Sequence, residues 1–214
     1  MKKTILIIVI VLIVIGIGIG IYFLVTQKKE TTTNLNTSTT KEPVTNTIVN
    51  KVTPPNYERF AESGGYISFD KIQEWTEISP EQIQKAITEE QRNGYTIVYY
   101  SANPAGVVLA VSKKSFESGA KTLTQNFDDD TELAQKQSAS YKIIDKKITD
   151  DSARSEAQIT IQDKSYTIYS KAMMKNVSGE NKDWYYIMEV SVPDNLEESY
   201  SDVTNYLFDS MSIL

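Results

Sequence analysis

The longest apolar run of the chain lies at its N-terminus, where residues 5–25 read ILIIVIVLIVIGIGIGIYFLV without a charged side chain. As an α-helix this run spans about 31 Å, which matches the hydrocarbon core of a bilayer. Every backbone amide in hydrocarbon needs an internal hydrogen bond, so a single segment crosses as a helix. No small-residue cleavage site follows the run. The pattern predicts an uncleaved transmembrane signal anchor behind a short cytoplasmic tail, residues 1–4.

Two further expectations concern this anchor. Gly16 and Gly20 stand four residues apart, a spacing that lets two membrane helices approach closely, so a homodimer through this helix face is one expectation. Lysines flank the run on both sides and nearly balance each other. Because the short tail before a signal anchor normally stays inside, we expect the C-terminal domain to be extracytoplasmic.

Residues 26–56 are dominated by threonine and asparagine and contain few large apolar side chains. Such a segment buries too little surface to offset its chain entropy, so we expect a disordered linker. A flexible coil of this length spans about 30 Å. Asn36 begins an Asn-X-Ser triplet in the linker and Asn176 begins another in the later part of the chain, and both are glycosylation acceptors if exposed outside a glycosylating cell.

Beyond residue 57 the apolar positions alternate in short runs, which is typical of half-buried β-strands. Short runs of this kind occupy residues 66–69 and 75–78. A helix is predicted over 80–93, because Ser79 and Gln82 form a capping box around Pro80 and Gly94 can end it. Strands at 95–100 and 106–112 then flank a turn around Pro104, and a polar helix is expected over 115–139. Its acidic residues favour a helix start there by complementing the helix dipole.

The C-terminal part continues with four predicted strands and a final helix. The strands cover 141–148, 157–162, 165–174 and 184–192, and in the last one every second residue from Trp184 to Val192 is apolar. The helix carries an apolar stripe made of Leu196, Tyr200, Val203, Leu207 and Met211. This order predicts a globular α+β domain over residues 57–214, with an antiparallel β-sheet covered by helices.

Charge and composition narrow the classes of function. The formal net charge is −6, yet residues 1–55 carry six lysines against two glutamates, so residues 56–214 carry −10. Such an acidic domain repels phosphate backbones, which argues against nucleic-acid binding. Two lysine pairs, at 113–114 and 146–147, are expected to be solvated strand ends or turns. Cysteine and histidine are both absent, which excludes disulfides, a lipid-carrying cysteine and histidine-dependent catalysis.

Two groups of residues are candidates for binding. Asp128, Asp130 and Glu132 have a spacing that faintly resembles a calcium loop, and Ca²⁺ is the only cofactor we expect if any is bound; a solvated helix start is the competing interpretation. Thirteen tyrosines suggest a surface that stacks on ligands, with half-buried core positions as the alternative. The candidate ligand-contacting aromatics are Tyr99, Tyr100, Tyr169 and Tyr185.

Two segments of the domain resemble PsbP-like proteins: YISFDKIQEW, which runs toward Trp75, and YSDVTNYLFDSMSIL, with Phe208 to Ser212 at its end. The sequence departs from the family pattern where Ile72-Gln73-Glu74 replaces the usual proline before the tryptophan. The resemblance covers about residues 57–214. It implies an αβα sandwich in a membrane-anchored prokaryotic member, and it specifies no activity.

These features favour a non-enzymatic, extracytoplasmic interaction module with a protein or cell-envelope partner. A cation- or small-ligand-binding domain is the alternative. A histidine-free hydrolase is a second alternative, which would need a Ser-Lys pair or two carboxylates; the Gly-X-Ser-X-Gly motif of many hydrolases is absent.

Overall fold

A computed structural model of the chain describes residues 55–86, 93–177 and 179–214. The predicted tail, membrane anchor, Gly16/Gly20 helix face and nearly all of the linker with Asn36 therefore lie outside the described residues. Within the described ranges, none of the helices is both long enough and apolar enough to cross a bilayer.

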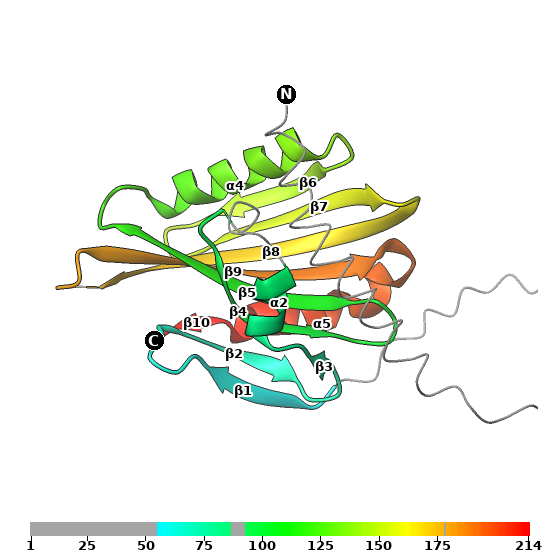
Figure 1. Cartoon of the computed structure of the whole chain (residues 1–214). Coiled ribbons are helices and arrows are strands. Elements are labelled where there is room, and N and C mark those ends of the chain that lie inside the picture. The colour runs from blue at the N-terminus through cyan, green and yellow to red at the C-terminus, as the bar shows by residue number, and fades with distance from the viewer. Residues whose placement is uncertain (1–54, 87–92, 178) are drawn as a thin grey trace, which may run out of the picture.

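The centre of the domain is a seven-stranded antiparallel sheet (Figure 1). The strand order across it is β3-β4-β5-β9-β8-β7-β6, so the long strands β8 and β9 lie near the middle. Its strands are β3 (Thr76–Glu77), β4 (Thr96–Ala102), β5 (Val108–Glu117), β6 (Lys142–Ile148), β7 (Ala153–Ile161), β8 (Lys164–Val177) and β9 (Lys182–Pro193).

A smaller antiparallel sheet has the order β1-β2-β10, with β1 (Tyr57–Ala61), β2 (Ile67–Ile72) and β10 (Ser212–Ile213). Strand β10 pairs with β2, so the end of the chain lies beside its first strands. The α+β class and the antiparallel sheet are as predicted. The second sheet is an addition that the alternation pattern did not indicate, because β1 is mostly exposed and β10 is only two residues long.

Two helices, α2 (Pro80–Ala86) and α4 (Leu123–Gln137), lie on one face of the large sheet. The predicted capping box of α2 is confirmed, because Ser79 and Gln82 exchange hydrogen bonds of 3.3 Å. Helix α4 begins later than predicted, since β5 continues through Glu117 alongside β9 and Thr122 then caps the helix. The expectation that the acidic run begins this helix is therefore wrong, and the run lies in the middle of α4.

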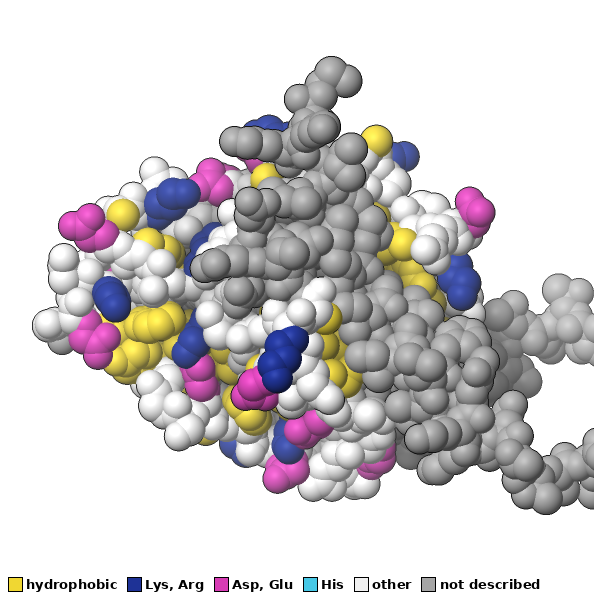
Figure 2. All heavy atoms as spheres, in the orientation of Figure 1, with side chains coloured by type: hydrophobic (Ala, Val, Ile, Leu, Met, Phe, Trp, Pro, Cys, Tyr) yellow, Lys and Arg dark blue, Asp and Glu magenta, His cyan; other side chains and the backbone are white. Residues whose placement is uncertain are grey.

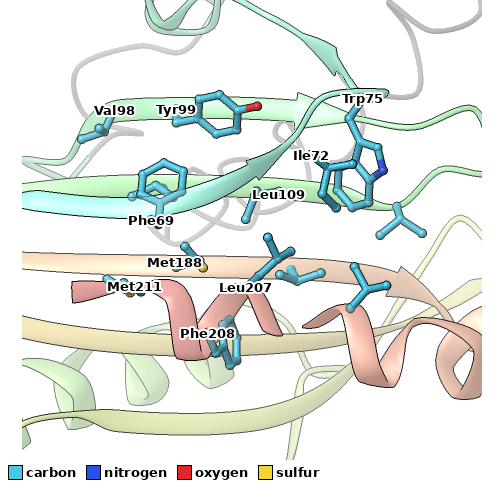
Figure 3. Close-up of a cluster of buried hydrophobic side chains, with 14 of the residues drawn as sticks. Phe69, Ile72, Trp75, Val98, Tyr99, Leu109, Met188, Leu207, Phe208 and Met211 are labelled. Atoms are coloured by element: carbon cyan, nitrogen blue, oxygen red, sulfur yellow. The ribbon is translucent and has the colours of Figure 1, made fainter. Parts of the chain in front are cut away.

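The opposite face carries the largest core cluster, between the large sheet, the small sheet and α5 (Glu197–Ser210), which follows a 3₁₀ turn, η1 (Asp194–Leu196). Figure 3 shows Phe69 from β2, Met188 from β9 and Leu207 from α5 converging there. The predicted inner face of the last strand is confirmed, with Tyr186 and Met188 fully buried. Because alternate residues point to opposite faces, the other residues of β9 face α4.

Candidate functional site

The three candidate calcium ligands do not converge. Successive residues of an α-helix point about 100° apart, and each carboxylate of the run has its own lysine. Asp128 pairs with Lys146, Asp130 with Lys114 at 3.0 Å, and Glu132 with Lys136 at 2.9 Å. Figure 2 shows acidic and basic side chains interspersed on the visible face. No cluster of acidic side chains suited to a metal ion occurs among the described residues, so calcium binding stays a prediction without geometric support.

The four candidate tyrosines are likewise not brought together. Tyr99 belongs to the core beneath α5, whereas Tyr100 belongs to the cluster beside α2, and both are buried. Tyr185 is fully buried on the α4 side. Tyr169 alone is partly exposed, on the α5 side. The structure therefore presents no joint aromatic surface made of these residues.

The lysine pair at 113–114 is not solvated, which corrects the expectation from the sequence. Neighbouring residues in a strand point to opposite faces, so the pair splits across the sheet. Lys113 pairs with Glu62 on one face and Lys114 with Asp130 on the other, and their side chains are only 19% and 15% exposed. In the second pair, Lys146 contacts Asp128 and Thr131 of α4 and is partly buried, whereas Lys147 is exposed as expected.

Asp130 is the centre of a polar cluster between α4 and the large sheet, which we call the Asp130 cluster: Tyr95, Lys114, Asp130, Tyr185 and Glu189. Residues three apart share one side of a helix, so the burial of Phe127 turns Asp130 toward the sheet. Lys114 and Tyr185 are directly opposite each other in β5 and β9. Tyr95 immediately precedes β4, which brings a fourth segment to the same place.

The geometry of the cluster encloses the Lys114–Asp130 pair. The Lys114 ammonium lies 4.5 Å from the ring centre of Tyr95 and 4.8 Å from that of Tyr185. The Tyr95 hydroxyl donates a hydrogen bond of 2.5 Å to the carboxylate oxygen of Asp130 that Lys114 does not contact. The two tyrosine rings meet edge to face, with centres 6.4 Å apart. The ion pair is thus held in a largely desolvated, aromatic surrounding.

Glu189 contributes a second carboxyl group to the Asp130 cluster, and no lysine or arginine of the described residues pairs with it. It shares the face of β9 with Tyr185, lies opposite Ser170 of β8, and belongs to none of the ion pairs seen within the described ranges. Burial, followed by the charge of Asp130, raises the pKa of Glu189 to about 7. Burial and the Asp130 charge also raise the pKa of Tyr95 and Tyr185. The Tyr185 hydroxyl is near Asp130 yet makes no hydrogen bond of ordinary geometry.

A second acidic group lies on the opposite face, at the start of α5. An open depression of about 440 Å³ is lined by Tyr169, Asp194, Glu197, Glu198 and Ser201. The Tyr169 hydroxyl donates to Glu197 at 3.2 Å. Burial and then the charge of Glu197 raise the pKa of Glu156 nearby. The ion pairs of the described residues leave Asp194, Glu197 and Glu198 without a cation. This surface therefore keeps an uncompensated negative field.

Nucleophile pairs suited to hydrolysis are not assembled at either place. Ser118 and Lys121 stand at a Ser-X-X-Lys spacing, but the Ser118 hydroxyl donates to Asp183 at 3.2 Å while Lys121 pairs with Asp129 at 2.5 Å. The second glycosylation candidate, Asn176, is also engaged, because its amide nitrogen donates to Asp183 at 2.6 Å and to Ser118 at 2.9 Å.

An antiparallel sheet between helices, closed by a C-terminal helix, gives the domain the PsbP-like fold. The structure is similar to that of CyanoP, the cyanobacterial PsbP of Synechocystis, with a TM-score of 0.52 and 10% identity over 76% of this chain and 95% of that one. No protein-family description and no curated protein matches the sequence.

Two more distant similarities are to the Ran-binding protein Mog1p of Saccharomyces cerevisiae and to LpqN of Mycobacterium tuberculosis, which is involved in cell envelope biogenesis. Mog1p has a TM-score of 0.44 and 9% identity over 75% of this chain and 96% of that one. LpqN has a TM-score of 0.42 and 10% identity over 74% and 90%. At 10% identity the similarity to CyanoP concerns the fold alone and leaves the function open.

Proposed function

We propose that this chain is a non-enzymatic interaction module, displayed on the outer side of the cell membrane by the predicted anchor at residues 5–25. The observation that carries the interaction role is the acidic depression at the start of α5. Its three carboxylates lack cations within the described domain, whereas most carboxylates around α4 are paired with lysines. A partner that presents lysine or arginine side chains would complete this surface.

The charges of this surface also determine how such a partner is held. Like charges brought together on a surface repel each other, and a cation from a partner removes that repulsion on binding. Tyr169 offers a partly exposed ring and Ser201 a hydroxyl at the same place. Long basic side chains can pack their apolar stems against such a ring while the charged ends reach the carboxylates.

A zero-length carbodiimide reagent tests this proposal, because it joins carboxylates to lysine amines in direct contact. In native membranes we expect a cross-linked species that contains the chain and is lost when Glu197 and Glu198 are both changed to glutamine. The matched control is Glu117→Gln, which removes an exposed carboxylate at the end of β5. Cross-linking that survives the double change, or disappears equally in the control, would refute the proposed surface.

A further inference from the structure

The Lys114–Asp130 pair has the arrangement of reactants for amide formation. The Lys114 nitrogen is 3.0 Å from one Asp130 oxygen, so the amine is held beside the carboxyl carbon that it would attack. Their side chains are only 15% and 17% exposed. Other pairs on α4 lack this enclosure, since the side chains of Lys121 and Asp129 are 48% and 53% exposed.

From this geometry we propose that Lys114 and Asp130 join spontaneously in an intramolecular isopeptide bond, which links β5 covalently to α4. The rings of Tyr95 and Tyr185 enclose the Lys114 side chain and keep water from the pair. The inference is independent of the proposed partner surface, which lies on the opposite face of the sheet.

The reaction balances without any added reagent. A proton passes from the Lys114 ammonium to the Asp130 carboxylate, which gives an amine and a carboxylic acid. The nitrogen lone pair attacks Cγ of Asp130, so a C–N bond forms while the carbonyl π bond opens onto its oxygen. One Cγ–O bond then breaks, and that oxygen leaves as water with the protons released by the nitrogen. The products are one amide and one water molecule.

Tyr95 is the catalytic residue of this step, because its hydroxyl touches the reacting carboxyl group at 2.5 Å. In the tetrahedral intermediate the oxygen that Tyr95 contacts carries the developing negative charge, and a fixed donor stabilises such a charge. Among the described residues no hydrogen bond or ion pair joins Glu189 to either reacting group, but its own charge repels that of Asp130. Conversion of Asp130 into a neutral amide removes this repulsion between α4 and the sheet.

Intact-mass measurement of the denatured full-length chain tests the proposal. We expect the wild-type chain to weigh one water molecule less than its sequence, and a proteolytic digest to contain one branched peptide with residues 114 and 130. Lys114→Arg keeps the positive charge and the ion pair, and Asp130→Ala removes the acceptor, so both should have the full mass. Lys146→Arg is the matched control on the neighbouring pair and should keep the lower mass. Circular dichroism confirms that each variant is folded.

The rate at which the isopeptide bond forms provides a second test. In freshly purified chain, Tyr95→Phe should slow the appearance of the lower mass by about tenfold or more, because one oxyanion donor is lost. A wild-type chain that keeps its full mass after prolonged incubation in the folded state would overturn the proposal. So would a lower mass that persists in Lys114→Arg, since dehydration of an aspartate to a cyclic imide also releases one water molecule.

Discussion

Glu189 shows how a single side chain can make stability depend on pH. It stands in the middle of the large sheet, with Ser170 and Ala110 as its cross-strand neighbours, so neither residue directly opposite it is a cation. A carboxyl group in that position is more easily buried protonated than ionised. Its ordinary pKa of 4.5 rises to about 7 in the folded chain.

The raised pKa of Glu189 determines how the stability of the fold changes with pH. A group with a raised folded-state pKa contributes stability below its unfolded pKa, and the contribution is lost as the pH rises from 4.5 through about 7. Glu189→Gln cannot ionise, so we expect its Tm to exceed that of the wild type at about pH 8 and the difference to shrink at about pH 5. Thermal unfolding followed by circular dichroism at both values measures this. An equal difference at both values would contradict the assignment, and Glu117→Gln serves as the exposed control.

Individual residues also show which parts of the candidate site could be predicted from the sequence and which could not. The alternation of β5 places Lys113 and Lys114 on opposite faces, but the predicted strand ends at residue 112 and does not include them. Their partners could not be predicted either, because Glu62 and Asp130 come from a turn and from a helix that begins later than predicted. Glu189 lies in a strand that was predicted correctly, but its lack of a cation depends on strand order, which alternation does not give.

At the scale of elements, the C-terminal end of α5 is held by a buried lysine from β8. Lys171 is 6% exposed, and its ammonium donates to the carbonyl oxygens of Phe208 at 2.5 Å and Met211 at 3.2 Å. The last carbonyls of a helix have no partner within the helix, and a cation there also complements the helix dipole. Arg59 assists from the small sheet by donating to the Ser210 carbonyl at 2.7 Å.

Replacement of this lysine should loosen the end of the helix. Lys171→Met retains most of the apolar stem but removes the charged donor from two buried carbonyls, of which Phe208 keeps only the 3.3 Å bond from the Met211 N–H. We therefore expect a loss of about 1–3 kcal/mol in the free energy of unfolding. Urea denaturation measures the loss. Lys182→Met, at an exposed position at the start of β9, should change stability by less than about 0.5 kcal/mol. A similar loss in the two variants would show that Lys171 has no special role.

Elements with a strong local signal were predicted well. The capping box around Pro80 fixed the start of α2, and the spacing of Val203 and Leu207 identified the side of α5 that packs on the sheet. Strand β1 was missed because its residues are mostly exposed and it gains its place by pairing with β2. The early start given to α4 has a similar cause, since residues 113–117 are held in β5 by hydrogen bonds to β9 rather than by local preference.

At the scale of the whole molecule, the topology follows from the proposed anchor and is open to a direct experiment. If the C-terminal domain lies outside, protease added to intact cells should cut the linker at residues 26–56 and release the acidic domain. Immunoblotting of whole cells and of the released fraction measures this, with a cytoplasmic protein as the integrity control. Protection of the domain until the cells are lysed would show that it lies inside.

The position of β1 has a mechanical consequence for a domain attached at its N-terminal side. The chain enters the fold at Tyr57, in an edge strand that pairs with β2 alone. A pulling force transmitted along the backbone therefore acts first on the small sheet, where the hydrogen bonds of β1 can open one after another from that end. The seven-stranded sheet receives this force only through the core that joins it to the small sheet. Under tension we expect β1 to detach from β2 first, which lengthens the molecule while the central sheet keeps its shape.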